Sequence, residues 1–274
     1  MRCLNRIIIL SLVFHAASWA HESDQLREEA EAGNLHSQVD LARVFMDLQD
    51  YPNAMFWYLQ AGEQGDAHAQ FQLGEIYRLG LGIKPDPERA ADWYRRAAES
   101  GYTDAQYNLA LMYANGIGVQ EDLQEAARWY ARAAERDHAP AQYNLAVLYR
   151  QGQGMAQDNE RAVYWYEQAA DQGYVEAQYN LGAMYYNGNG VNQDPVIAAE
   201  WFTRAAAQGY AAAQFTLGLM YYNGTGVEKD HIQAYQWLDL AARSGHAEAA
   251  RSLNILQTEL SPEQLRQVRQ LDNN

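Results

Sequence analysis

The sequence predicts an all-α protein in which antiparallel helix pairs stack into a solenoid. Two sets of residues recur every 36 positions: the alanines Ala69, Ala105, Ala141, Ala177, Ala213 and Ala249, and the tryptophans Trp93, Trp129, Trp165, Trp201 and Trp237. Apolar residues also recur with helical spacing inside each copy. A fixed period in this range indicates a repeat array, in which each copy buries its apolar face only against its neighbours.

The first helix of each copy has two distinct faces. In one copy, steps of 100° place Ala105, Leu109, Ala110, Met112 and Tyr113 on one side, and Tyr107, Asn108, Leu111, Ala114 and Asn115 opposite them. We expect the first side to pack and the second to stay available. A small residue follows each leucine (Gly74, Ala110, Ala146, Gly182, Gly218), and alanine pairs recur in the second helix, as at 97/98 and 133/134. Both features favour close helix contact.

A Gly-x-Gly segment that is similar to a phosphate-binding loop follows the first helix in five copies. An aspartate stands six residues after the first glycine each time, at Asp86, Asp122, Asp158, Asp194 and Asp230. Aspartate followed by proline, or by glutamate three residues later, is typical of a helix N-cap. Glycine suits the left-handed turn that ends a helix. No Lys-Ser or Lys-Thr follows any copy, so we interpret the segment as a linker between helices, not as a nucleotide site.

The repeated unit Ala-Gln-Tyr-Asn-Leu-Gly-x-Met-Tyr-x-x-Gly-x-Gly-Val, with the Asp, Ala-Ala-x-Trp-Tyr and Ala-Ala that follow it, resembles the Sel-1-like repeat. Six such repeats occupy 37–248, and the first is four residues shorter. The resemblance implies a right-handed α-solenoid, related to tetratricopeptide repeats, whose first helices line a concave surface. It also implies a scaffold or adaptor role. Some cysteine-rich bacterial members of the family have been assigned β-lactamase or penicillin-binding activity, but this chain lacks their cysteines.

The two ends of the repeat array carry the signals of capping helices. We expect an N-terminal capping helix within 21–36, centred on the acidic stretch DQLREEAEA, and C-terminal capping helices in 249–274. The last of these begins at a capping box, Ser261-Pro262-Glu263-Gln264. Both caps have polar outer faces, so the sequence favours a monomer.

The first 20 residues have the layout of a secretory signal peptide with cleavage after Ala20. Two arginines precede a short apolar run, and small residues occupy the third-last and last positions before the cut. We therefore expect a periplasmic or secreted protein without membrane insertion after cleavage. The single cysteine, Cys3, lies in this leader, so the mature chain is expected to lack disulfides.

The charge balance argues against nucleic acid as a partner. The chain has 20 basic and 35 acidic side chains, a formal charge of −15, and removal of the leader deletes two arginines and no acids. Such a chain has no basic stripe with which to displace counterions from a phosphate backbone. A cationic partner fits the sign better, and solubility alone explains it equally well.

Residues that could carry chemistry are few, and no cofactor is expected. The serines form neither Gly-x-Ser-x-Gly nor Ser-x-x-Lys. His36 and His68 occupy matching places in adjacent copies, but no third metal ligand is evident, so no metal site is expected. His138 and His246 follow second helices, where a cationic ring stabilises a helix C-terminus. A cell-wall-directed or β-lactam-hydrolysing enzyme is the alternative to a scaffold, supported by family analogy alone.

Two polar columns follow the first helices. The glutamines Gln38, Gln70, Gln106, Gln142, Gln178 and Gln214 fall toward the packed side, where we expect their amides to bond to neighbouring backbone. The second column is the candidate partner-binding surface, namely Tyr107, Asn108, Tyr143, Asn144, Tyr179 and Asn180, together with Arg78, Arg150, Tyr186 and Tyr222. Tetratricopeptide domains, which this chain resembles, hold a peptide backbone with an asparagine at the matching place. The alternatives are that the column packs one repeat on the next, or that the protein is a structural spacer.

The leader generates a prediction about processing. Expressed in a Gram-negative host, the protein should be released by osmotic shock with His21 at its N-terminus, because signal peptidase cuts after small residues. N-terminal sequencing of the released protein checks this outcome, and a chain that still begins at Met1 would contradict it.

Overall fold

The computed structural model describes residues 24–271, and every element in that range is a helix. The chain divides into two compact units, 1–122 and 123–274. Even-numbered helices from α2 to α12 are the first helix of each repeat, and odd-numbered helices from α3 to α13 are the second, called B helices below. The term A helices is used for the first helices and for α14, which follows the last repeat in the same place. The predicted all-α solenoid of antiparallel helix pairs is confirmed. The predicted leader and its cut site lie outside the described residues.

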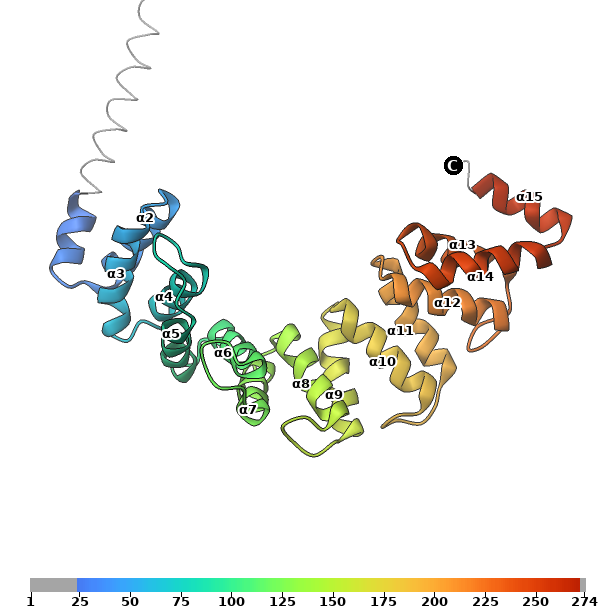
Figure 1. Cartoon of the computed structure of the whole chain (residues 1–274), viewed down its shortest axis with the longest axis horizontal. Coiled ribbons are helices and arrows are strands. Elements are labelled where there is room, and N and C mark those ends of the chain that lie inside the picture. The colour runs from blue at the N-terminus through green and yellow to red at the C-terminus, as the bar shows by residue number, and fades with distance from the viewer. Residues whose placement is uncertain (1–23, 272–274) are drawn as a thin grey trace, which may run out of the picture. The chain divides into compact units, whose positions relative to one another are not determined.

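In the first unit a helix at residues 24–31 leads into five further helices that pack one on the next (Figure 1). These are α2 (Leu35–Asp47), α3 (Tyr51–Glu63), α4 (Ala67–Leu79), α5 (Pro87–Glu99) and α6 (Thr103–Asn115). The first repeat lacks the glycine loop, and α2 is joined to α3 by a short turn with Gln49 in the left-handed region.

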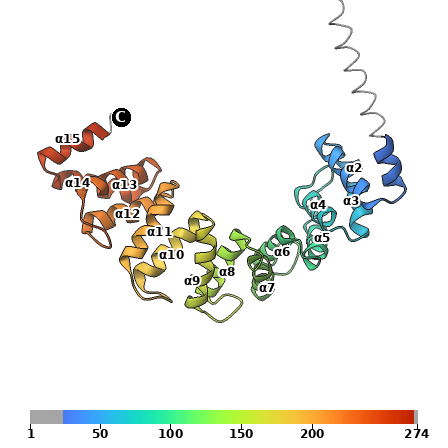
Figure 2. The same cartoon turned by 180° about the vertical axis from the view of Figure 1, so that it is seen from behind.

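The second unit continues the same alternation, seen from both sides in Figures 1 and 2. Its helices are α7 (Leu123–Ala134), α8 (Ala139–Gln151), α9 (Asn159–Asp171), α10 (Val175–Asn187), α11 (Pro195–Ala207), α12 (Ala211–Asn223), α13 (His231–Arg243), α14 (Ala247–Glu259) and α15 (Pro262–Leu271). Ser261 and Gln264 form the reciprocal capping box at the start of α15. Val268 of α15 is buried with Leu238 and Leu256, so this helix covers the end of the core.

The glycine segments are linkers between helices, as predicted. The first glycine of each segment ends its A helix in the left-handed region, with φ between 64° and 74°. Asp86, Asp158, Asp194 and Asp230 cap the following B helices by accepting bonds from backbone amides. At four of the five segments a β-carbon at the second glycine would overlap backbone of the preceding B helix, as one on Gly118 would overlap the Pro87 carbonyl, and one on Gly82 would overlap the Tyr51 β-carbon. Glycine is therefore required for the loop to lie against that helix.

Small residues let the A and B helices approach closely, also as predicted. A β-carbon on Gly74 would come within 2.5 Å of the Tyr94 ring, and one on Gly182 within 2.9 Å of the Phe202 ring. The alanine pairs of the B helices, 97/98, 133/134, 169/170 and 205/206, are almost wholly buried. The fully buried aromatic side chains come from one position of the B helices, where Tyr94, Tyr166 and Phe202 occur.

The glutamine column is structural, in agreement with its prediction. Each of the six glutamines is buried and donates from Nε2 to a carbonyl eight residues earlier, at 2.9–3.1 Å, in the last turn of the preceding helix. In three repeats the Oε1 atom accepts a second bond, from Gln64, Gln172 or Gln208. Ser100 and Ser244 occupy the equivalent place in other repeats, where Oε1 of Gln70 and Gln214 has no partner among the described residues.

The interpretation of His138 and His246 as cations at a helix C-terminus is wrong. Each ring accepts a hydrogen bond at Nδ1 from a backbone amide, His138 from Ala141 and His246 from Ala249, at 3.2 and 3.3 Å. An accepting ring nitrogen carries no proton, so the imidazole acts as the N-cap of the following A helix. The turn between the helices is short, so the backbone amide of the same residue bonds to the preceding B helix, His138 to the Ala133 carbonyl and His246 to the Ala241 carbonyl. Tyr102, Tyr174 and Tyr210 occupy this place in other repeats and form no such bond.

No helix in residues 24–271 is long and apolar enough to cross a bilayer.

Candidate functional site

The outward side of the A helices in the second unit carries three parallel columns, which together are called the A-helix face. One column is polar (Asn144, Asn180, Thr216, Ser252), one is mainly aliphatic (Val147, Ala183, Leu219, Ile255), and one holds Arg150, Tyr186 and Tyr222. Within each helix the three positions are three residues apart, so they lie on one side. All of these side chains are half-buried or exposed, so the second unit presents a continuous mixed surface.

The predicted tyrosines of this region are largely packing residues. Tyr143 lies with its ring centroid 5.8 Å from that of Tyr166 and 5.2 Å from that of Tyr174. Tyr179 contacts Phe202 and Tyr210 in the same way, at 5.5 and 5.2 Å. Burial raises the pKa of the Tyr143 hydroxyl. Each ring therefore joins an A helix to the B helix and turn that follow it, and only part of it reaches solvent.

The asparagines keep acceptor capacity on the A-helix face. Nδ2 of Asn144 donates to the Pro140 carbonyl at 3.0 Å, and Nδ2 of Asn180 donates to the Glu176 carbonyl at 2.8 Å. A bond from Asn180 to the Tyr143 hydroxyl also opposes the rise in that tyrosine's pKa. These bonds use amide hydrogens and leave the side-chain oxygens as acceptors for a backbone N–H.

In the first unit the equivalent column forms a closed polar network. Glu75 accepts hydrogen bonds from the buried Tyr94 hydroxyl, from Asn108 at 3.1 Å, and from Arg78 at 2.5 Å. The bond to Glu75 raises the pKa of Arg78, while burial and then the bond to Glu75 raise that of Tyr94. The predicted residues Arg78 and Asn108 are thus brought together at Glu75, which supplies a carboxylate partner for Arg78. Tyr107 lies half-buried on the same helix as Asn108.

Arg150 occupies the place of Arg78 in the second unit and has no such partner. Val147 stands where Glu75 would be, and Arg150 is exposed and forms no ion pair with any residue in 24–271. The Tyr166 hydroxyl is buried near Arg150 without a hydrogen bond of normal geometry. Burial raises its pKa to about 12, and the positive charge of Arg150 acts in the opposite direction. The second unit therefore presents an uncompensated cation at this place.

The far end of the A-helix face holds a small pocket that the sequence analysis missed. Its volume is about 120 Å³, and it is lined by residues of α12, α13 and α14: Leu219, Tyr222, Leu238, Ser252, Ile255 and Leu256. Tyr222 borders it and donates to Glu259 at 2.7 Å, which raises the pKa of that tyrosine. The only sequence feature that points to this pocket is Leu238, which replaces the aromatic residue of earlier repeats. A single aliphatic residue at that position is not enough to predict a pocket.

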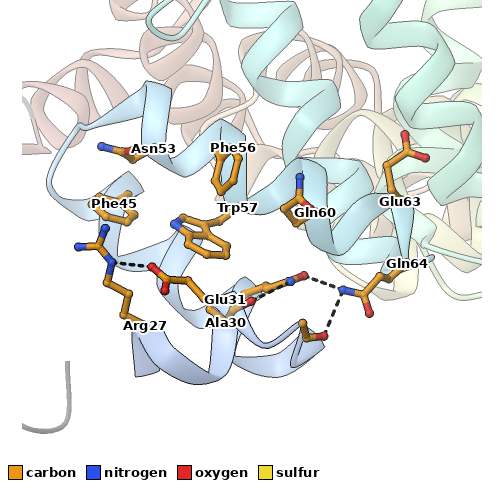
Figure 3. Close-up of a pocket in the computed structure, with 12 residues that line it drawn as sticks. Arg27, Ala30, Glu31, Phe45, Asn53, Phe56, Trp57, Gln60, Glu63 and Gln64 are labelled. Carbon is orange, nitrogen blue, oxygen red and sulfur yellow. Dashed lines mark hydrogen bonds and ion pairs between the residues drawn. The ribbon is translucent and has the colours of Figure 1, made fainter. Parts of the chain in front are cut away.

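A larger groove, about 850 Å³, lies in the first unit between the helix at residues 24–31, α2 and α3 (Figure 3). Phe45, Phe56 and Trp57 form its apolar part, and the Phe56 and Trp57 rings meet edge to face at 5.0 Å. None of the predicted binding residues lines this groove. Its polar rim, including the pair Arg27–Glu31, is largely bonded within itself.

The predicted absence of a metal site at His36 and His68 remains a prediction. His68 lies 3.3 Å from the Tyr102 hydroxyl and 3.5 Å from Arg43, and burial, followed by the charge of Arg43, lowers its pKa. His36 is exposed. Within residues 24–271 no three His, Cys, Asp or Glu side chains gather in a metal-binding arrangement.

The contrast between Tyr94 and Tyr166 generates a stability prediction. Tyr94→Phe should lower the free energy of unfolding by about 1.5–3 kcal/mol, because it removes a buried bond to a charged acceptor. Tyr166→Phe should leave stability unchanged or raise it, because the lost hydroxyl is buried and unbonded. Urea unfolding of both variants provides the measurement, each serving as the other's control. Equal losses in the two variants would contradict the network.

Solved structures with the same fold include two with more than 30% sequence identity to this chain. Over 92% of this chain, the structure of c5321, a protective antigen of uropathogenic Escherichia coli with an SLR fold, is 37% identical, with a TM-score of 0.75. This chain spans 55% of that structure's length. A Sel1 repeat protein from Oxalobacter formigenes is 32% identical over 79% of this chain and 86% of its own, with a TM-score of 0.69. No curated protein matches.

The sequence profile of the family described as Sel1 repeat matches six consecutive segments. They are 38–66, 67–102, 103–138, 139–174, 175–210 and 211–246. Each segment after the first begins with an A helix and ends just after a B helix, so the profile follows the repeat that the structure shows. The chain belongs to the Sel1 repeat family.

Proposed function

We propose that this protein is a non-enzymatic scaffold that holds an extended segment of a partner protein on the A-helix face of its second unit. Sel1 repeat proteins commonly mediate protein interactions. The observation that carries the proposal is the recurrence of three columns, polar, aliphatic and Arg/Tyr, on successive A helices from α8 onward. The core already contains the residues needed for stacking, so these exposed columns are available to a partner.

The spacing of the columns suits an extended chain. Neighbouring helices are separated by roughly 10 Å, and an extended strand advances about 3.3 Å per residue. One A helix therefore meets roughly every third residue of a bound segment. The oxygens of Asn144 and Asn180 can accept from its backbone amides, while the aliphatic column contacts its side chains. Backbone recognition at several equal steps fits this open surface better than a catalytic pocket does.

The site of action follows from the leader at 1–20, which supports a periplasmic or secreted location. The acidic charge of the chain supports a protein partner over nucleic acid. If the protein were a β-lactam-hydrolysing enzyme, the purified protein would hydrolyse a chromogenic β-lactam. The scaffold proposal expects no hydrolysis in this assay. A structural spacer would have no position-specific partner on the A-helix face.

Site-specific photocrosslinking distinguishes a binding face from a spacer. Replacing Tyr186 with photoreactive p-benzoylphenylalanine should give a discrete crosslinked partner in cells, because this tyrosine projects from the A-helix face with 37% of its surface exposed. The same replacement at Tyr164, 52% exposed on the B helix α9, is the matched control and should give none.

Gel electrophoresis of irradiated cells, followed by mass spectrometry of the shifted band, makes this measurement. A partner crosslinked at Tyr164 but not at Tyr186 would place binding on another face. Crosslinks at neither position would favour the spacer.

A further inference from the structure

The pocket between α12, α13 and α14 arises from one departure from the repeat. In two preceding repeats of the second unit, the position of Leu238 holds an aromatic ring: Tyr166 packs against Tyr143, and Phe202 packs against Tyr179 and Gly182. In the last repeat Gly218 is retained, but the residue against it is Leu238. The backbone thus keeps room for a ring while the side chain is smaller, and a hollow of about 120 Å³ lies beside it.

The size and lining of this hollow indicate what fits it. Pockets for whole small molecules are typically about 300–1,000 Å³, so 120 Å³ corresponds to a single side chain. Leu219, Leu238 and Leu256 make its walls aliphatic, and Ile255 at its edge is 60% exposed. Apolar cavities of this order take up apolar groups in preference to water. An aliphatic side chain therefore matches both the volume and the chemistry.

At the other end of the A-helix face, the matching group on a partner would be acidic and not aliphatic. Arg150 on α8 is exposed, forms no ion pair with a described residue, and is the counterpart of Arg78, which Glu75 neutralises. A carboxylate from a partner would supply Arg150 with the negative charge that Glu75 supplies to Arg78 and that Val147 cannot supply. The net negative charge of the chain acts at long range and is screened beyond about 10 Å in ordinary buffers, so it does not prevent a local pair at Arg150.

We infer that the second unit recognises an extended partner segment carrying an aliphatic side chain for the α12–α14 pocket and a carboxylate for Arg150. This inference rests on the proposed function and specifies the chemistry of its ligand. The A helices from α8 to α14 span roughly 25 Å between the two contacts at about 10 Å per step. At about 3.3 Å per residue, the two side chains are roughly seven or eight residues apart.

A phage-displayed library of random dodecapeptides, panned on the full chain, provides the probe. Enriched peptides should share an aliphatic and an acidic residue at that spacing, and a synthetic peptide of the consensus sequence is then titrated by calorimetry. Leu238→Phe should weaken its binding at least tenfold, because the ring fills the pocket as Phe202 does in the preceding repeat. Ile255→Ser, at an exposed position, should act in the same direction without disturbing the core.

The acidic contact has its own variant and its own peptide. Val147→Glu should neutralise Arg150 as Glu75 neutralises Arg78, and should weaken binding at least fivefold. It should have no effect on a peptide whose acidic residue is replaced by its amide. Val196→Ala, at a 56% exposed position of α11, is the control and should bind within twofold of the unchanged protein. Melting temperatures of all variants report whether folding is preserved.

The outcomes separate this inference from the proposed function. If Tyr186→Ala weakens peptide binding but Leu238→Phe and Val147→Glu do not, the inference is overturned and the proposed scaffold function stands. Enriched peptides without the paired aliphatic and acidic residues would do the same. Peptides indifferent to all three positions, or no enrichment at all, would overturn the proposed function as well.

Discussion

A buried hydrogen bond from a glutamine side chain to the last turn of the preceding helix sets the position of each A helix. The last carbonyls of a helix lack the intrahelical amide partner that the others have, and a buried hydrogen bond contributes about 0.5–1.5 kcal/mol. The glutamine amide bonds to one such carbonyl in every repeat, as Gln178 does to Ala170, whose carbonyl also accepts from the Gly173 amide. Because the tyrosine and asparagine follow the glutamine directly, this bond also determines which residues of the A helix face outward.

Function in such an array is expected where one repeat differs from the others. Glu75 closes a network around Arg78 in the first unit, and Val147 leaves Arg150 without a carboxylate partner in the second. Leu238 in place of an aromatic ring opens a pocket. None of these changes affects the glutamine bond or the glycine linkers, so the fold tolerates them. The repeat supplies a regular surface, and single substitutions give parts of that surface different chemistry.

The features that depend on the spacing of residues along the chain were predictable from the sequence. The helix pairs, the caps at Asp86, Asp158, Asp194 and Asp230, and the buried glutamines follow from periodicity and from backbone groups that must be satisfied, and these are confirmed. The prediction for His138 failed because sequence position places the residue beside two helix ends and does not say which one its ring meets. The pocket was not predicted because it is an unfilled volume between three helices, and the sequence does not show how closely those helices pack. The difference between Arg78 and Arg150 was readable from the sequence, because Glu75 precedes one arginine by three residues and Val147 precedes the other.

The most direct test of this account compares the free energies of unfolding of Gln178→Leu and Gln214→Leu by urea titration. Both variants remove a buried hydrogen bond and leave the Ala170 or Ala206 carbonyl with only its bond from the Gly173 or Gly209 amide, so both should be less stable than the unchanged chain. Gln178→Leu should lose more, because it also removes the acceptor of Gln208, whereas the Gln214 oxygen has no partner to lose. Unchanged stability in both variants would contradict the claim that the glutamine bond positions the A helices.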